Sequence, residues 1–442
     1  MNKAPALPLE KYLDALDKTT TCQLKGRISQ AIGLTIEATG PRVRMGELCF
    51  LQTNYSDRQL VPAEVVGFKD KKILLMPLGN LEGIGPGSEL LASGTTLRVQ
   101  VGMELVGRVL NGLGEPIDDR GRIKSETTYP VTNQPPSPLK RKRITEVLQV
   151  GVKAIDGLVS IGKGQRMGIL AGSGVGKSTL IGMIARNTEA DINVIALIGE
   201  RGREVREFLE RDLGEEGLAK SVVVVATSDQ PALVRLKGAF VATSIAEYFR
   251  DQGKDVLLLM DSVTRFALAQ REVGLAIGEP PATRGYTPSV FAMLPKLLER
   301  AGTSEKGTIT GLYSVLVEGD DLNEPITDAV RGILDGHIAL SRSLAAMNLY
   351  PAIDVGQSIS RVMIDIASPK HIKNANRFRG ILATYEEARD LIDIGAYKKG
   401  SNPRIDESIA LIDKCQNFIR QDIYDEANIT TTLENLEEAV RL

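Results

Sequence analysis

The sequence predicts an α/β core that follows a small N-terminal β-barrel and leads into a C-terminal helical domain. Short β-rich segments fill the first part of the chain, apolar strands alternate with amphipathic helices in the middle, and the last part is polar and helical. With 442 residues the chain is long enough for about three domains. We expect the barrel over residues 22–92, the α/β core over 93–358 and the helical domain over 359–442.

The composition excludes several function classes. Hydrophobic residues make up 43% and charged residues 25%, which is ordinary for a folded globular chain. The 54 Lys and Arg balance 56 Asp and Glu, so no nucleic-acid partner is expected. Because no apolar run approaches the roughly 20 residues of a membrane span and the first residues lack a secretory signal, we expect a cytoplasmic protein.

Cysteine and histidine are too rare to build a framework or a metal site. The two histidines, His337 and His371, leave almost no material for a histidine-based metal centre. Cys22, Cys49 and Cys415 are widely separated, so we expect small buried residues and not disulfides.

Residues 1–21 are predicted to form one amphipathic helix. Its apolar stripe has the spacing i, i+3, i+4, i+7 and consists of Leu9, Tyr12, Leu13 and Leu16. Such a stripe either docks on the domain that follows or binds in the groove of a partner protein, and the sequence pattern leaves both open.

Short strands with frequent turns predict the closed barrel. The segment has few aromatic residues and no basic stripe, so a packing or assembly role is favoured over binding of single-stranded nucleic acid. The predicted strands are Lys25–Ile32, Gly33–Ala38, Glu47–Gln52, Val61–Phe68, Lys72–Met76 and Ser88–Ala92. A connector rich in glycine and proline follows, with a basic run from Lys140 to Arg143 that is either a patch for a partner or a solvated loop. We assign the run no function.

The middle of the chain repeats a strand, a loop and a helix. Its strands are continuous apolar runs, as expected when helices cover both faces of a right-handed parallel sheet. They are Met167–Ala171, Asn193–Ile198, Ser221–Ala226, Asp255–Met260 and Thr308–Val317. In the helical part that follows, Lys373–Ile394 and Glu407–Ile419 have amphipathic patterns.

The sharpest motif joins an apolar strand to a helix and reads Ala-Gly-Ser-Gly-Val-Gly-Lys-Ser-Thr over residues 171–179. Its glycines let the backbone turn so that several N–H groups point at one anion, and the helix N-terminus adds positive potential there. Lys177 can reach terminal phosphates, and the Ser178 hydroxyl is placed to bind Mg²⁺. Ala171 departs from the strict pattern, which begins with glycine. The predicted phosphate-binding residues are Gly172, Ser173, Gly174, Val175, Gly176, Lys177, Ser178 and Thr179.

Two acids follow apolar strands at the edge where such sheets bind ligands. Asp261 ends one strand and is expected to hold Mg²⁺ through water, while Arg265, four residues on, can reach towards a γ-phosphate. Glu200 follows another strand, where an acid can orient and deprotonate the attacking water. The alternative for Glu200 is a helix-start acid favoured by the helix dipole.

Together these motifs resemble the type III secretion ATPases, most closely the flagellar protein export ATPases, which are relatives of the catalytic β subunit of rotary F-type ATP synthases. The likeness covers nearly all of residues 22–442. Besides the phosphate loop, the motifs that carry it are Gly199–Glu204, Asp261–Arg265, Gly278–Tyr286, Tyr350–Asp354 and Ser358–Arg361.

The resemblance implies a RecA/F1-like P-loop NTPase core that binds ATP and Mg²⁺. Lys177 and Ser178 would hold phosphates and metal, with Asp261 acting on the metal through water. Glu200 would be the general base, and Arg201 and Arg265 would lie near the γ-phosphate. Tyr350 would lie against adenine, although by sequence alone it is equally a core tyrosine. Arg361 would be an arginine finger that enters the neighbouring subunit's site.

The resemblance also implies the partners. A finger acting in trans implies a homohexamer in which every interface is a site. The N-terminal helix would dock a regulatory or stator protein, and the barrel would promote ring assembly. The C-terminal domain would face export chaperones and substrates at export-gate membrane proteins, which places the protein at the inner face of the cell membrane. Hydrolysis would drive chaperone release, unfolding or entry of exported proteins.

Four alternatives stay open. Injectisome ATPases share every motif with flagellar ones, and the flagellar interpretation is favoured. Catalytic subunits of rotary F- or V-type ATPases usually have glycine where this chain has Ala171. A non-catalytic nucleotide-binding scaffold would have lost the acid at Glu200. A hexameric RNA translocase is disfavoured by the balanced charge.

Overall fold

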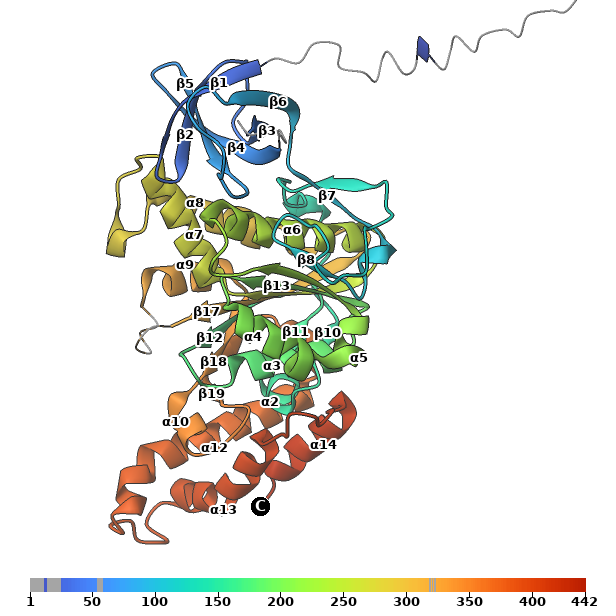
Figure 1. Ribbon diagram of the computed structural model, residues 1–442. Helices are drawn as coiled ribbons and strands as arrows, with labels where there is room; N and C mark the ends of the chain where they lie inside the picture. Colours follow the sequence, from blue (N-terminus) through green and yellow to red (C-terminus); the bar gives the residue numbers. More distant parts are fainter. Residues whose placement is uncertain (1–11, 14–24, 54–58, 318, 320, 322) are drawn as a thin grey trace, which may run out of the picture. The chain divides into compact units, whose positions relative to one another are not determined.

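The computed structural model describes residues 12–13, 25–53, 59–317, 319, 321 and 323–442 (Figure 1). The chain divides into two compact units, Met1–Leu97 and Arg98–Leu442. Of the predicted N-terminal helix, only Tyr12 and Leu13 are described, and both are helical and exposed. Leu9 and Leu16 lie outside the described residues.

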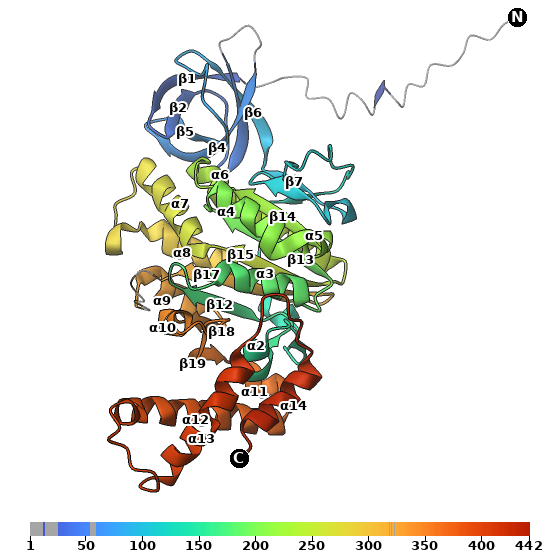
Figure 2. The ribbon, with the colours of Figure 1, turned by 60° about the horizontal axis from the view of Figure 1, so that its bottom comes forward.

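The first unit contains the predicted barrel, seen nearly end-on in Figure 2. Its strands close in the order β1-β2-β5-β4-β3-β6, and each is antiparallel to its neighbours. Alternate side chains such as Ile28, Ile36 and Leu90 point inward and form the core. The strands are β1 Lys25–Ile32, β2 Thr35–Thr39, β3 Glu47–Gln52, β4 Leu60–Lys69, β5 Lys72–Pro77 and β6 Glu89–Thr96. β6 runs past the predicted end of the barrel because Thr96 still pairs with Glu47.

The second unit is built on one sheet with the strand order β19-β18-β12-β17-β15-β13-β14-β8. β13 and β14 are buried along their whole length, which explains their unbroken apolar sequences. The strands are β8 Val109–Asn111, β12 Arg166–Ala171, β13 Ile192–Ile198, β14 Ser221–Ala226, β15 Asp255–Asp261, β16 Gly302–Thr303, β17 Thr308–Leu316, β18 Gly336–Leu340 and β19 Ile353–Ser360. Small pairs are formed by β7 Arg98–Gln100 with β9 Thr128–Pro130, and by β10 Val147–Leu148 with β11 Ile161–Gly162.

The edges of this sheet differ from the sequence prediction. β8, in the predicted connector, pairs in parallel with β14, and β16 runs antiparallel to β17. β19 runs antiparallel to β18, so the prediction of a wholly parallel sheet is wrong at this edge. The expected start of the helical domain at Ile359 falls inside β19. This strand was not predicted because it is a polar edge strand, which lacks the apolar run of a buried one. Its polar centre is Gly356, Gln357 and Ser358.

Helices cover both faces of the sheet (Figure 1). α6 and α7 pack on one face and α3 and α5 lie on the other. The helices of the core are α2 Lys153–Leu158, α3 Lys177–Asn187, α4 Gly202–Glu207, the π-helical η3 Phe208–Leu213, α5 Gly214–Ala219, α6 Ala232–Asp251, α7 Val263–Ala276, α8 Pro288–Leu298, α9 Pro325–Ile333 and α10 Arg342–Ala346. Single 3₁₀ turns lie at η1 Met103–Leu105, η2 Pro138–Lys140 and η4 Thr283–Gly285.

The helical C-terminal domain consists of α11 Met363–Ile366, α12 Pro369–Asp393, α13 Pro403–Ile419 and α14 Ile429–Ala439. α12 starts where the Ser368 hydroxyl accepts a hydrogen bond from the backbone of His371, with Pro369 at the first helical position. α12, α13 and α14 pack against α2, and Phe378 meets Phe418 edge-on at 5.5 Å between ring centroids. None of the described helices has the length and apolarity that a membrane span requires.

The cysteines and the histidine His371 that the structure describes are buried in the folded core. Cys49 and Cys415 are buried free thiols, as predicted, and burial raises the pKa of each to about 12. Cys22 lies outside the described residues. His371 is buried, with its Nε2 2.7 Å from the Gly157 carbonyl oxygen.

Candidate active site

The predicted phosphate-binding loop lies at the carboxyl ends of the sheet strands. β12 leads into it and α3 follows it, so the strand–loop–helix context that the motif requires is present. The loop lines a cavity of about 620 Å³, together with residues that follow β13 and β15, namely Glu200, Arg201, Glu204, Thr264 and Arg265. This volume lies within the range of nucleotide-sized ligand pockets.

Two glycines of the loop adopt backbone conformations that other residues avoid. Gly174 has φ +77° and Gly176 has φ +88°, and Gly176 is the residue that precedes the first turn of α3. A Cβ at Gly176 would meet the Tyr350 ring at 3.5 Å, whereas one at Gly174 would meet nothing within 4 Å. Gly174 is therefore required for its dihedral angles and not for space.

Three charged side chains meet beside the phosphate-binding loop. The Lys177 ammonium group contacts the Asp261 carboxylate, and its Nζ lies 3.8 Å from Oε1 of Glu200. All three side chains are largely buried. They meet because β15 lies beside β13, with Leu197 in register with Asp261, so the acid that ends one strand is adjacent to the acid that follows the other.

Ser314 is a site residue that sequence reasoning missed. Its hydroxyl donates to Oδ1 of Asp261 at 2.6 Å from β17, the strand between β12 and β15. Thr264 provides a second link, because its Oγ1 accepts the backbone N–H of Leu316. A hydroxyl inside the buried run Thr308–Leu316 was the only signal in the sequence, since a buried polar group needs a partner.

The environment of Glu200 changes its acidity. Burial and the neighbouring Asp261 carboxylate raise the pKa of Glu200 to about 7, although Lys177 opposes the shift. A carboxyl group with a pKa close to neutrality exchanges protons readily at physiological pH, which suits a general base.

The two arginines predicted near the γ-phosphate have different surroundings. Arg201 precedes α4, is exposed, and forms an ion pair with Glu204 at 3.3 Å. Arg265 lies on α7, with its side chain packed beside Gly199 and its Nε buried without a hydrogen-bond partner among the described residues. A buried, unpartnered donor at the wall of an anion site has hydrogen-bonding capacity left for a ligand.

The hydroxyl and carboxylate oxygens fit a magnesium ion bound with a nucleotide. Ser178, Glu200 and Asp261 line one small cavity beneath the loop. Mg²⁺ prefers oxygen ligands and is held in such sites by one or two protein groups, waters and substrate phosphates. No cluster of three His, Cys, Asp or Glu side chains occurs in the described part of the chain. The Ser178 hydroxyl and the Asp261 carboxylate, which line this cavity, are groups that could hold such an ion.

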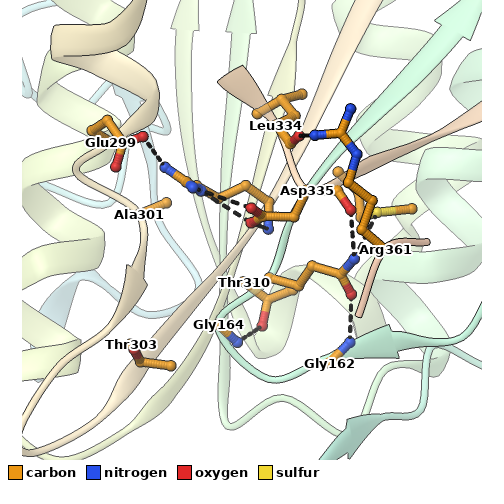
Figure 3. Close-up of polar contacts among 12 residues, drawn as sticks. Gly162, Gly164, Glu299, Ala301, Thr303, Thr310, Leu334, Asp335 and Arg361 are labelled. Carbon is orange, nitrogen blue, oxygen red and sulfur yellow. Dashed lines mark hydrogen bonds and ion pairs between the residues drawn. The ribbon is translucent and has the colours of Figure 1, made fainter. Parts of the chain in front are cut away.

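Tyr350 lies beside the phosphate-binding loop, whereas Arg361 lies apart from it. The Tyr350 ring packs beside Gly176, and its backbone carbonyl accepts the N–H of Gln421 from the C-terminal domain. Arg361 follows β19 at the amino end of β18, and its Nη1 donates to the Leu334 carbonyl oxygen at 3.3 Å (Figure 3). The structure thus brings Lys177, Glu200 and Asp261 together at the carboxyl ends of the strands. Arg361 lies at the opposite, amino ends.

Comparisons with known proteins match the architecture domain by domain. The β-barrel domain of the ATP synthase alpha/beta family matches residues 28–94, and the nucleotide-binding domain of that family matches residues 151–360. The T3SS EscN ATPase C-terminal domain matches residues 367–438. A flagellum-specific ATP synthase of Bacillus subtilis is 56% identical over 93% of this chain and 94% of its own length.

The chain belongs to the family of flagellar and type III secretion ATPases. A second member, a type 3 secretion system ATPase of Xanthomonas euvesicatoria, is 51% identical over 93% of both chains. The family is one of ATP-hydrolysing enzymes, and the barrel, P-loop core and helical domain expected from the resemblance are confirmed.

Solved structures of this family superpose closely. The assembled ATPase EscN of the enteropathogenic E. coli type III secretion system is 47% identical, with a TM-score of 0.89 over 94% of this chain and all of that one. EscN in complex with its central stalk EscO gives a TM-score of 0.87 at 46% identity over the same share of each chain.

Proposed function

We propose that this chain is the ATP-hydrolysing component of a type III protein export apparatus, the flagellar one, and couples hydrolysis to chaperone release, unfolding or entry of exported proteins. The observation that carries the enzymatic part is the convergence of Lys177, Asp261 and Glu200 below a phosphate-binding loop. Similarity to both a flagellum-specific and a type 3 secretion system relative supports the export apparatus.

The loop and Lys177 bind the nucleotide in this proposal. Backbone N–H groups of Gly172 to Gly176 surround the phosphates, and Lys177 contributes a positive charge to the terminal ones. Bound Mg²⁺ would neutralise charge on the β- and γ-phosphates, with Ser178 and Asp261 as its protein partners. Tyr350 covers the adenine, and Arg265 and Arg201 complete the wall around the γ-phosphate.

Glu200 is the residue that activates water. It lies at the wall of the cavity, within 3.8 Å of the lysine that holds the phosphate. With a pKa near 7, its carboxylate accepts a proton from water as that water attacks the γ-phosphorus, the bond from this phosphorus to the oxygen bridging the β- and γ-phosphates breaks, and ADP leaves. Asp261 stays with Lys177 and Ser314 and therefore serves to fix the lysine and the metal's water, not to remove a proton.

Arg361 is proposed to act on the neighbouring copy. Arg166 and Ala171 are the two ends of β12, so about 16 Å of strand separates the region of Arg361 from the phosphate loop of its own chain. An arginine side chain does not span that distance. The assembled relative EscN supports a ring, proposed here as a homohexamer in which each subunit lends a finger to the next.

The remaining partners follow from the same proposal. A regulatory or stator protein would bind the apolar stripe of residues 1–21, and the relative EscN binds a central stalk protein. Export chaperones, export substrates and gate proteins in the membrane would complete the apparatus. The protein would then be cytoplasmic and peripheral at the inner face of the cell membrane.

The Glu200→Gln variant tests the enzymatic proposal. It should bind ATP and Mg²⁺ as the wild type does but lose about 10²–10⁴-fold in kcat, the usual contribution of a general base. Glu207→Gln is the matched control, because Glu207 lies on the adjoining helix in an exposed pair with Arg203. Near-normal hydrolysis by Glu200→Gln would refute the assignment.

Two further observations separate the alternatives. ATPase activity of the purified chain without a second type of subunit favours an export ATPase over a rotary F- or V-type subunit. Neighbouring genes for flagellar rod and hook proteins favour the flagellar system, and genes for a needle complex favour an injectisome.

A further inference from the structure

The amino end of β12 carries a polar network that surrounds the residue proposed as the finger (Figure 3). We propose that Gln165, Arg166 and Asp335 are positioning residues that hold Arg361 in the orientation needed to reach the neighbouring site. The inference rests on the proposed role of Arg361 and adds the part of the chain that fixes it. In this proposal the strand β12 leads into the phosphate loop at its carboxyl end, and the residues that position Arg361 lie at its amino end.

The backbone around Arg361 is held by hydrogen bonds. The Arg361 N–H donates to the Asp335 carbonyl oxygen at 3.0 Å, and the Asp335 N–H donates to the Arg166 carbonyl oxygen at 2.8 Å. Gln165, fully buried, adds a cross-link, because its Nε2 lies 3.2 Å from the same Asp335 oxygen and 3.0 Å from Oγ of Ser360. Its Oε1 accepts the Gly162 N–H at 2.8 Å. The chain on both sides of the Ser360–Arg361 bond is therefore tied to β12.

An arginine clamp fixes the Asp335 side chain. Arg166 donates through Nε and Nη2 to the two carboxylate oxygens of Asp335, at 3.1 and 3.2 Å. Its Nη1 lies 2.5 Å from Oε1 of Glu299. Although burial opposes it, these two carboxylates raise the pKa of Arg166 above its ordinary value. A two-point contact of this kind sets direction as well as distance, so the Asp335 turn is held in one orientation.

The clamp is in turn anchored to the rest of the core. Arg141, from the basic run to which the sequence assigned no function, donates to the Ala301 carbonyl oxygen at 2.8 Å and contacts the Glu299 carbonyl oxygen. Thr303 donates to the Lys142 carbonyl oxygen at 2.6 Å. These contacts fix the segment that presents Glu299 to Arg166 and show that the basic run is bound to the core at Arg141.

The same arrangement leaves the guanidinium group of Arg361 uncommitted to any acid. The carboxylates of Asp335 and Glu299 are paired with Arg166, and within the part of the chain that the structure describes the Arg361 side chain donates to the Leu334 carbonyl oxygen alone. Among the described residues no carboxylate pairs with Arg361. Transition-state stabilisation requires an available charge and a fixed position. An arginine without an ion pair on a fixed backbone supplies both to a partner's phosphate.

Asp335→Asn tests the positioning role, because it keeps the size of the side chain and removes the charge that holds Arg166. We expect kcat to fall about 10–100-fold, as for a catalytic group displaced by about an ångström, with the KM for ATP unchanged. Arg166→Lys, which keeps the charge and loses the two-point contact, should lower kcat in the same way. Asp118→Asn is the matched control, since Asp118 forms a similar two-point pair with Arg108 far from the finger.

Mixing subunits separates a misplaced finger from a damaged active site. Glu200→Gln subunits have no base but carry an intact finger, so in rings assembled at random from equal amounts of both subunits they should restore activity to Asp335→Asn subunits at about one interface in four. Arg361→Ala subunits mixed with Glu200→Gln subunits show independently whether the finger acts in trans.

The outcomes discriminate between the two proposals. Low kcat of Asp335→Asn that is rescued by Glu200→Gln supports the inference. Wild-type kcat in both Asp335→Asn and Arg166→Lys overturns it, as does an equal loss in the Asp118→Asn control. If Arg361→Ala is rescued and Asp335→Asn is not, the network acts within its own subunit and the inference fails alone. If Arg361→Ala is not rescued either, the trans role of Arg361 fails and the inference fails with it.

Discussion

The two ends of strand β12 hold similar charges in opposite arrangements. At the carboxyl end, Lys177 contacts Asp261 and approaches Glu200, so the cation is matched by acids of its own chain. At the amino end, Arg166 pairs with Asp335 and Glu299, and the Arg361 side chain donates to the Leu334 carbonyl oxygen. At one end the cation is therefore paired with acids of its own chain, whereas at the other end no carboxylate of the described residues pairs with the Arg361 guanidinium group.

The two ends of β12 are therefore suited to different tasks, nucleotide binding at one end and acceleration of hydrolysis in a neighbouring subunit at the other. Buried carboxylates near Lys177 orient it and tune the acidity of Glu200, which a self-contained binding site requires. A guanidinium group on a fixed backbone suits a phosphate bound by a neighbouring subunit, because its charge is not neutralised by an ion pair within its own chain. Binding of nucleotide and acceleration of its hydrolysis should therefore respond to different mutations.

The largest effect is expected from Arg361→Ala. Because the proposed finger would stabilise charge that develops only in the transition state, kcat should fall about 10³–10⁵-fold while the Kd for ATP stays at the wild-type value. Steady-state kinetics and equilibrium binding of a fluorescent ATP analogue measure the two quantities. A parallel loss of affinity would contradict the separation between the two ends of β12.

Lys177→Ala should have the complementary effect, on binding. Loss of the ammonium group removes a charge-assisted contact and leaves Asp261 and Glu200 facing the phosphates, so the affinity for ATP should fall about 100-fold. Lys163→Ala is the control, because this lysine lies at the amino ends of the strands in pairs with Glu146 and Asp255. Equal losses in both variants, measured by calorimetry, would show that the site is not where Lys177 lies.

The pH dependence sharpens the role of Glu200. Its pKa is raised to about 7, and only the ionised form accepts a proton, so kcat/KM should fall about tenfold for each pH unit below 7 and level off above it. Glu200→Gln should lose this slope, whereas Arg361→Ala, which keeps the base, should retain it at a lower rate. A slope that persists in Glu200→Gln assigns the titration to another group.

The smallest effect is expected from a change in β12 itself. Ala171 is buried at the end of the strand, so Ala171→Gly should lower the free energy of unfolding by about 0.5–1 kcal/mol through backbone entropy. Because glycine at this place also fits the strict loop pattern, kcat should stay at the wild-type value. Chemical denaturation and steady-state kinetics check the two parts, and a large loss of kcat would show that Ala171 tunes the loop.

The local part of the site was predictable from the sequence, and the contacts between distant elements were not. The run around Lys177 specifies its own turn, and Glu200 and Asp261 follow recognisable apolar strands. Ser314 could not be assigned because its contact with Asp261 depends on β17 lying between β12 and β15. Arg166 and Asp335 are ordinary polar residues until β18 is paired with β12.

The barrel and the edges of the sheet also show that local features were predictable from the sequence and that pairing between distant elements was not. β1 and β3 were predicted to the residue because alternation and turns are local signals. β8 was missed because it has only three residues, and β19 was missed because its sequence is largely polar; both are strands through their pairing with β14 and β18 at the edges of the sheet.

The specific ATPase rate of the purified wild-type chain, measured across a wide dilution series at saturating ATP, tests most directly the claim that one subunit completes another's site. The rate per subunit should rise with protein concentration to a plateau, and Arg361→Ala should stay at the low rate throughout. A wild-type rate per subunit that stays constant down to concentrations at which sedimentation finds only monomers would contradict the claim.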